Sequence, residues 1–251
     1  MTGTLYLVPA PLDFGCDMPA TLNQALPDYT LRVAAGLRHW ICENAKTTRA
    51  YLKRIDALHP LCDTLQAMAI TELPREVHKK GDHQGGFDAR PLLQVALEGQ
   101  NVGLVSEAGM PAIADPGSSV VRAAHQLGIR VVPLVGPVSL MLTLAASGLN
   151  GQNFAFVGYL PAQNPERAQR IAELENLAHK TGQTQLFIET PYRNAALLDA
   201  LLQTLHPATV LATASGLTLE SAEVHSTSAK DWRQRGWKIA QNVPTVFAIG
   251  R

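Results

Sequence analysis

One segment decides how this chain folds, and it reads LVSEAGMPAIADPG (residues 104–117). Its apolar start belongs to a strand expected over residues 101–106, and the apolar spacing after it predicts a helix over 117–127. Between the two, Gly109 permits positive φ and close backbone approach, prolines stiffen the path, and Asp115 places a carboxylate just before the helix. The segment therefore predicts a strand, a ligand-binding loop and a helix in succession.

A second turn of this kind follows along the chain. Residues 130–134 predict a strand that runs into Gly136 and Pro137, and residues 137–147 predict a helix of small and apolar side chains. In an open parallel sheet such turns lie at one edge, outside the carboxyl ends of the strands, where ligands bind. The alternative is that both turns serve chain geometry alone, as many βα turns do.

The alternation of strands and helices predicts an α/β fold in two domains, residues 1–148 and 149–251. We expect a largely parallel sheet in the first domain and a mixed sheet in the second, because the last strands can pair antiparallel. The expected strands cover residues 4–8, 39–43, 65–70, 101–106, 130–134, 154–157, 184–189, 208–214, 219–226 and 243–249. The expected helices cover residues 18–37, 44–55, 88–98, 117–127, 137–147, 164–179, 191–204 and 229–235.

The composition is typical of a soluble α/β enzyme. Hydrophobic residues make up 46% of the 251 residues and aromatic residues only 6%, which indicates an aliphatic core. No run approaches the ~20 apolar residues of a membrane span, and no basic-then-apolar leader precedes the first strand. Cys16, Cys42 and Cys62 cannot all pair, and they form no metal-ligand spacing with the histidines. We expect a cytoplasmic protein with no metal site and no membrane partner.

The charges balance, since Lys+Arg and Asp+Glu each total 21, so contact with a nucleic acid needs a local basic patch. Two groups could form one: Lys46, Arg49 and Lys53 at helical spacing, and Arg75, Lys79 and Lys80 in a long polar loop expected over residues 72–86. The alternative for the helical group is an ordinary solvated face. A nicotinamide cofactor is disfavoured, because Pro9 and Pro11 remove backbone donors where a glycine-rich phosphate turn would need them.

Several motifs, in the right order along nearly the whole chain, resemble those of the tetrapyrrole methylase superfamily of S-adenosylmethionine (SAM)-dependent methyltransferases. They are LYLVPAP (5–11), SEAGMPAIADPG (106–117), VPLVGP (132–137), FVGYLP (156–161), FIETPYR (187–193) and PTVFAIG (244–250). Within the superfamily the chain is most similar to the ribosomal small-subunit methyltransferase I branch, which methylates a cytidine 2′-hydroxyl of 16S ribosomal RNA. The resemblance implies two α/β domains with SAM in a cleft between them, a homodimer, and ribosomal RNA as partner.

The resemblance also implies which positions hold the cofactor. They are Pro9, Ser106, Gly109, Asp115, Gly136, Pro137, Ser139, Leu186, Ile188, Ala212, Pro244 and Thr245. Backbone donors and a wall of small residues at these positions suit a ligand that carries a sulfonium, an amino acid and an adenine. Asp115 has a second interpretation as the N-cap of the following helix, and the two roles are compatible.

Methyl transfer to a ribose hydroxyl benefits from a general base. The candidates are Glu43 at the end of the second strand, His78 in the long loop and Glu107 after the fourth strand. His78 has the alternative interpretation of an exposed loop histidine. Glu189 has another role open to it, which is to organise the turn of residues 190–193 by accepting backbone hydrogen bonds.

The chain departs from the ribosomal branch at residues that bear on the substrate. Glu43-Asn44-Ala45-Lys46 stands where that branch typically has Glu-Asp-Thr-Arg, and residues 213–216 lack the charges of its Arg-Glu-Leu-Thr element. Lysine does not replace arginine in bidentate recognition of a phosphate. Two alternatives therefore stay open: a methyltransferase of a small molecule such as a tetrapyrrole-like metabolite, and a SAM-binding protein without transferase activity.

Overall fold

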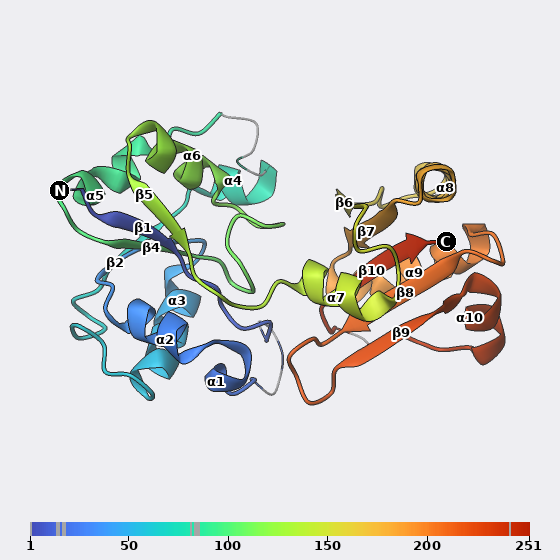
Figure 1. Cartoon of the computed structure of the whole chain (residues 1–251), viewed down its shortest axis with the longest axis horizontal. Coiled ribbons are helices and arrows are strands. Elements are labelled where there is room, and N and C mark those ends of the chain that lie inside the picture. Colours follow the sequence, from blue (N-terminus) through green and yellow to red (C-terminus); the bar gives the residue numbers. More distant parts are fainter. Residues whose placement is uncertain (1, 14–15, 17–18, 81, 83–85, 241) are drawn as a thin grey trace. The chain divides into compact units, whose positions relative to one another are not determined.

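The computed structural model describes residues 2–13, 16, 19–80, 82, 86–240 and 242–251, without the side chains of 78–80 (Figure 1). The chain divides into two compact units, Met1–Val138 and Ser139–Arg251. In the part of the chain that is described, no helix is long and apolar enough to cross a membrane.

The first unit is built on a five-stranded parallel sheet, as predicted, and its strand order is β3-β2-β4-β1-β5. Its strands are β1 (Thr4–Leu7), β2 (His39–Cys42), β3 (Ala69–Glu72), β4 (Val102–Val105) and β5 (Arg130–Pro133). Its helices are α1 (Leu22–Ala25), α2 (Asp28–Ala35), α3 (Ala45–Asp56), α4 (Arg75–Lys80), the 3-10 turn η1 (Arg90–Leu93), α5 (Gln94–Leu97) and α6 (Ser118–Gln126).

Both faces of this sheet are covered by helices, which is why β4 is buried along its whole length (Figure 1). On one face Trp40 packs with Leu31 of α2 and Leu52 of α3. On the other face Ile41 packs with Leu93 of η1 and Val120 of α6. The period-2 alternation of a strand therefore sends neighbouring residues of β2 into two separate cores.

Three local predictions for this unit were wrong. The helix expected over residues 18–37 is two helices, α1 and α2, because Pro27 lies between them and cannot donate a backbone hydrogen bond. The strand expected over 65–70 begins only at Ala69, where pairing with β2 starts. Part of the long loop expected over 72–86 forms the helix α4.

The second unit contains a five-stranded mixed sheet, again as predicted, and its strand order is β6-β7-β10-β8-β9. Only β6 and β7 are parallel, and the other neighbours are antiparallel. The strands are β6 (Phe154–Tyr159), β7 (Thr184–Ile188), β8 (Val210–Ser215), β9 (Glu223–Ser228) and β10 (Thr245–Gly250). The helices are α7 (Ser139–Ser147), α8 (Glu166–Thr181), the turn η2 (Pro191–Arg193), α9 (Asn194–Thr204) and α10 (Ala229–Arg235).

Aromatic rings hold the core of this unit together, with Phe187 and Phe247 stacked at 5.9 Å between ring centroids. Helix α7 packs on β8, β9 and β10, and the hydroxyl of Ser226 donates to the carbonyl of Ser147 at 2.6 Å. The structure therefore groups α7 with the second unit, whereas the sequence-based boundary after residue 148 had placed this helix in the first.

The close packing of β4 on β2 yields a stability prediction. A Cβ at Gly103 would lie 2.8 Å from two ring carbons of Trp40, which is fully buried and has no room to move. Gly103→Ala should therefore lower the free energy of unfolding by about 1–3 kcal/mol, measured by urea denaturation. Gly36→Ala is the matched control, because its Cβ would meet only ordinary contacts at 3.5 Å. Equal stability of the two variants would contradict this packing.

Candidate functional site

The carboxyl ends of β1, β4 and β5 are joined by backbone contacts at one edge of the first unit. Ala10 and Gly109 exchange two hydrogen bonds, at 2.9 and 3.0 Å between N and O. Gly136 lies against Pro9, so closely that a Cβ at Gly136 would be 2.3 Å from the Pro9 Cγ. Four predicted cofactor positions, Pro9, Gly109, Gly136 and Pro137, are thus gathered by β1 and the loops after β4 and β5.

The loop between β4 and α6 has an unusual backbone. Besides Gly109, both Ala112 (φ 66°) and Ala114 (φ 65°) occupy the left-handed region, which is uncommon for residues with a Cβ. Each costs of order 1 kcal/mol and persists only where the surroundings enforce it, as they do at ligand-binding loops. The prediction that residues 106–117 form a built loop agrees with this backbone.

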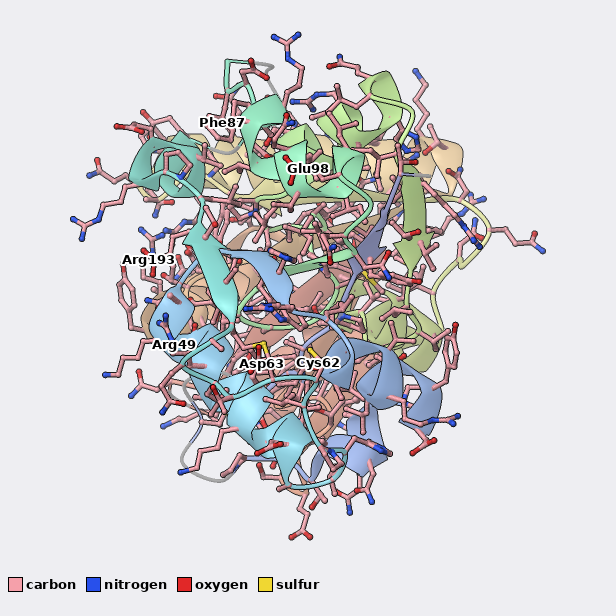
Figure 2. The ribbon with its side chains drawn as sticks, turned by 90° about the vertical axis from the view of Figure 1, so that its left-hand side faces the viewer. Arg49, Cys62, Asp63, Phe87, Glu98 and Arg193 are labelled. Atoms are coloured by element: carbon pink, nitrogen blue, oxygen red, sulfur yellow. The ribbon has the colours of Figure 1, made fainter. Side chains whose placement is uncertain are left out.

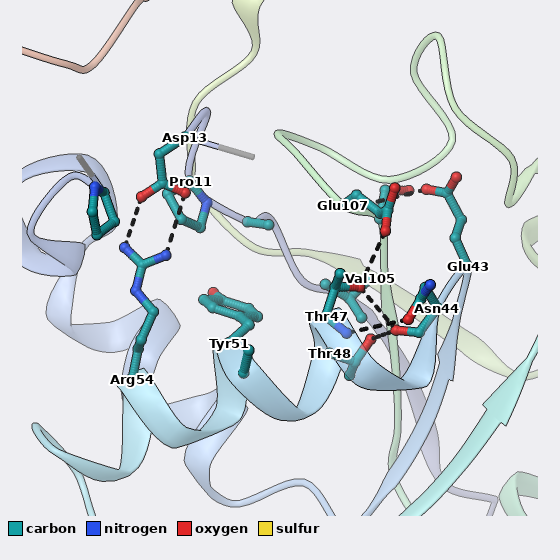
Figure 3. A pocket seen from close by; sticks show the side chains of 14 residues that line it. Pro11, Asp13, Glu43, Asn44, Thr47, Thr48, Tyr51, Arg54, Val105 and Glu107 are labelled. Carbon is teal, nitrogen blue, oxygen red and sulfur yellow. Dashed lines mark hydrogen bonds and ion pairs between the residues drawn. The ribbon is translucent and has the colours of Figure 1, made fainter. Parts of the chain in front are cut away.

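A pocket of about 180 Å³ opens beside this loop, at the carboxyl ends of β2 and β4 (Figure 3). It is lined by Ala10, Pro11, Asp13, Pro19, Glu43, Asn44, Thr47, Thr48, Ala50, Tyr51, Arg54, Val105, Ser106 and Glu107. Ser106 is 5% exposed, and its hydroxyl has no hydrogen-bond partner among the described residues. A buried hydroxyl without a protein partner is available to hydrogen-bond a water or a ligand.

Carboxylates concentrate at one end of the pocket (Figure 3). Glu43 Oε1 accepts from the backbone N–H of Glu107 at 3.3 Å, and Glu107 Oε1 accepts from the Thr47 hydroxyl at 3.2 Å. Burial, with added repulsion from Glu43 and Glu107, raises the pKa of Asp115 to about 7. The structure therefore brings together two of the three candidate bases and adds a third carboxylate that holds a proton near neutrality, a property that the sequence did not reveal.

The other end of the pocket carries a neutralised cation. The guanidinium of Arg54 donates to both carboxylate oxygens of Asp13, at 3.3 and 2.8 Å, and to the carbonyl of Ala20 at 2.6 Å (Figure 3). Tyr51 lies between the two ends, and its hydroxyl donates to the carbonyl of Pro9 at 2.8 Å. The pocket is thus polar and, on balance, acidic.

The cap of helix α6 is Asp82, not Asp115. The buried Asp82 carboxylate accepts from the backbone N–H groups of Gly117 and Ser119 at 2.9 and 2.8 Å and from the hydroxyls of Ser118 and Ser119. Burial alone would raise the pKa of Asp82, but these hydrogen bonds outweigh it and lower that pKa to about 2. Sequence reasoning missed Asp82 because it lies 35 residues before Gly117.

The remaining predicted positions lie in the second unit. Leu186 and Ala212 are fully buried, Ile188 ends β7, and Pro244 leads into β10. The Thr245 hydroxyl lies 2.9 Å from that of Ser215, and Ser139 begins α7. Their assignment to a cofactor stays a prediction.

The alternative role of Glu189 is confirmed. Its buried carboxylate accepts from the backbone N–H of Thr190 at 2.7 Å and pairs with Arg193 at 2.7 Å. Tyr192, in the same turn, is left 73% exposed.

The predicted basic patch is described only in part. Lys46, Arg49 and Lys53 are all exposed on one face of α3, and Figure 2 shows Arg49 on this helix. The side chains of His78, Lys79 and Lys80 lie outside the described part of the structure, so His78 remains an untested candidate. Cys62 is exposed beside Asp63 (Figure 2), and no disulfide joins the three cysteines.

A family model, Tetrapyrrole (Corrin/Porphyrin) Methylases, matches residues 40–232. The chain belongs to this family. Solved structures agree with the fold: the chain aligns over its full length with uroporphyrin-III-C-methyltransferase from Thermus thermophilus (TM-score 0.53, 19% identity, 93% of that chain). It also aligns over its full length with the methyltransferase CobJ (TM-score 0.56, 17% identity, 95% of that chain).

Curated relatives in sequence carry the name ribosomal RNA small subunit methyltransferase I. The protein of Halalkalibacterium halodurans is 31% identical over 203 residues, which are 80% of this chain and 60% of the relative. That of Escherichia coli O157:H7 is 33% identical over 205 residues, 79% of this chain and 59% of the relative. That of Vibrio cholerae is 38% identical over 124 residues, which are 49% of this chain and 42% of the relative. The chain therefore spans about two fifths to three fifths of the length of these relatives.

The raised pKa of Asp115 predicts a pH dependence of stability. An unfolded Asp ionises near 3.8, whereas folded Asp115 holds its proton to about 7, so its stabilising contribution is lost as the pH rises through this range. The free energy of unfolding of Asp115→Asn, which cannot ionise, should rise relative to that of wild type by on the order of 4 kcal/mol between pH 4 and pH 8. Urea midpoints at both pH values measure this. The exposed control Asp199→Asn should differ from wild type in stability by the same amount at both pH values. The same pH-independent difference for Asp115→Asn would contradict the raised pKa of Asp115.

Proposed function

We propose that this protein is a SAM-dependent methyltransferase that methylates a ribose 2′-hydroxyl of ribosomal or other structured RNA. Membership of the tetrapyrrole methylase family and the name shared by the sequence relatives support the reaction and the substrate. The observation that carries the proposal is the pocket beside Ser106, where an unsatisfied buried hydroxyl and a group of carboxylates meet at the carboxyl edge of the sheet.

The residues at this edge fit the methyl donor. The Ser106 hydroxyl supplies a buried hydrogen-bonding group that the protein itself does not use. Gly136 against Pro9 gives a flat wall of small residues, which a larger side chain would disrupt. When bound, SAM supplies an electrophilic methyl group on a sulfonium, and the protein has only to align it with an acceptor.

The carboxylates can orient the acceptor hydroxyl and accept its proton. Glu43 and Glu107 line the pocket as hydrogen-bond acceptors that can orient the hydroxyl of a ribose. Asp115, with its pKa near 7, is matched to accept a proton at neutral pH, because a general base is most effective when its pKa lies near the working pH. We therefore assign proton acceptance to this group of three carboxylates.

A tetrapyrrole is the less favoured substrate. Uroporphyrin-type rings carry many carboxylates and require cations, whereas this pocket offers two glutamates and an arginine already paired with Asp13. RNA instead places its phosphates outside the pocket, and exposed Lys46, Arg49 and Lys53 flank it on the same helix as Thr47 and Tyr51.

The proposal includes a cytoplasmic location and a homodimer. The absence of a disulfide among the three cysteines, all of which are described, suits a reducing compartment. Met141 and Leu142 on α7 are 41% and 40% exposed, which supports an apolar contact with a second copy.

The cofactor site is tested by titration calorimetry with SAM and with S-adenosylhomocysteine. Ser106→Ala should weaken binding by roughly three- to tenfold, the equivalent of one lost hydrogen bond, without loss of stability in the free protein. Thr143→Val is the matched control, because the Thr143 hydroxyl is also buried without a described partner but does not line the pocket. Equal affinities of the two variants would exclude Ser106 from the site, and absence of binding by wild type would refute the proposal.

The acceptor is tested by transfer of a labelled methyl group. Small ribosomal subunits from a strain without the corresponding enzyme should accept label, and uroporphyrinogen III should not. Glu43→Gln and Glu107→Gln should each lower kcat at least tenfold and leave the affinity for SAM within about twofold. Label on the tetrapyrrole alone would reverse the assignment of substrate.

A further inference from the structure

A group of cations in the second unit takes no part in the proposed site. Residues 139–251 contain nine Lys and Arg, and four of them fall within residues 230–238. We call these four, Lys230, Arg233, Arg235 and Lys238, the α10 cations. All four are exposed, on α10 and in the segment after it. Asp231 is the one acidic residue within this stretch of the sequence.

Among the described residues, Arg233 is the one α10 cation whose side chain makes a hydrogen bond within the protein. Arg233 donates to the carbonyls of Leu202 and Leu205 at 2.6 Å each, which closes the end of α9. Among the described residues, no carboxylate lies within 4.0 Å of Lys230, Arg235 or Lys238, so these three form no ion pair. The carboxylate of Asp231 instead accepts from the hydroxyls of Thr227 and Ser228. Three positive charges are therefore presented to solvent.

Aromatic rings lie beside these charges. The guanidinium carbon of Arg235 is 4.6 Å from the centroid of the Trp237 ring. The imidazole of His225, on β9, is 4.4 Å from the same ring with a tilt of 31°. Trp232, which is fully buried, meets Trp237 edge-on at 5.1 Å and so holds it in place. The result is a fixed stack of flat groups whose outermost member, Arg235, is exposed.

We propose that the surface formed by the α10 cations, His225 and Trp237 binds single-stranded RNA, as a second contact for the RNA that the pocket methylates; this rests on the proposed function. Lysines and arginines neutralise phosphates, while a guanidinium plane stacked on a tryptophan offers a face to an unpaired base. Cations interleaved with rings match a polyanion that carries flat bases better than they match an acidic peptide, which has no rings to stack.

The register of the sheet places the start of α10 at the end opposite to Thr245, whereas His225 pairs with Thr213, beside the predicted cofactor position Ala212. Thr245 pairs with Ser215, and Ser215 with Glu223, at one end of the sheet. At the other end Val210 pairs with Ser228, and α10 starts at the next residue. Six strand residues separate the two ends, roughly 20 Å. In this proposal the surface contributes to the binding of RNA and not to the chemical step.

The test uses the triple variant Lys230→Gln, Arg235→Gln, Lys238→Gln and a fluorescein-labelled single-stranded oligouridylate. Anisotropy titrations at several salt concentrations should show at least about tenfold weaker binding, with the slope of log K against log salt shallower by about 2, since each neutralised phosphate of a single strand contributes about 0.7. The control, Arg170→Gln with Lys180→Gln on α8, removes two positive charges elsewhere in the same unit, the exposed Lys180 and the half-buried Arg170 that pairs with Glu173, and should bind nearly as wild type does.

Stacking is tested separately by Arg235→Lys, which keeps the charge and loses the planar group. It should weaken binding of oligouridylate several-fold and leave binding of inorganic polyphosphate, which has no bases, unchanged. In methyl transfer to small ribosomal subunits, the triple variant should raise KM and preserve kcat and SAM affinity.

Wild-type affinity and salt slope in the triple variant would overturn the inference. Displacement of the RNA by poly-L-glutamate as readily as by an oligouridylate of equal charge would also overturn it, in favour of an acidic protein partner. These outcomes are independent of the proposed function, because SAM binding and methyl transfer by wild type are measured without reference to α10.

Discussion

The architecture of the candidate site depends on the close approach of three backbone segments at the carboxyl edge of the first sheet. The two hydrogen bonds between Ala10 and Gly109 join the end of β1 to the loop after β4. The contact between Gly136 and Pro9 adds the turn after β5. A side chain at Gly109 would press on Leu12, and one at Gly136 would overlap Pro9. The two glycines therefore allow the three segments to approach one another at one edge of the sheet.

Several carboxylates lie close together at that edge, and the structure shows how the repulsion between them is limited. Glu43 and Glu107 accept hydrogen bonds from neighbouring groups, whereas Asp115 avoids a third charge by holding its proton to about pH 7. Asp82, which is distant in sequence but accepts hydrogen bonds at the end of the same loop, stays ionised because four donors at the start of α6 surround it. The pKa values of two aspartates near the same loop are thus shifted in opposite directions: burial and the two glutamates raise that of Asp115, and hydrogen bonds lower that of Asp82.

Local pattern was enough to predict the fold class and both kinds of sheet, because apolar periodicity and glycine-containing turns act within a few residues. It also placed Pro9, Gly109, Gly136 and Ser106 at the first sheet, since turns after parallel strands must meet at one edge. It failed where partners are distant in sequence. Asp82 caps a helix that begins far along the chain, and the raised pKa of Asp115 comes from burial in the folded structure and from two glutamates that follow separate strands. The division of the chain before α7 depends on packing against β8 to β10, which no local pattern reports.

The proposed site places the methyl donor against the loop of residues 106–117. Hydrogen–deuterium exchange of the protein with and without saturating SAM tests it most directly, because exchange reads each segment separately. We expect slower exchange in residues 106–117 and 9–12 on addition of SAM, with α10 unchanged. Unaltered exchange in 106–117, with SAM shown to be bound, would place the methyl donor elsewhere on the chain and refute the proposed site.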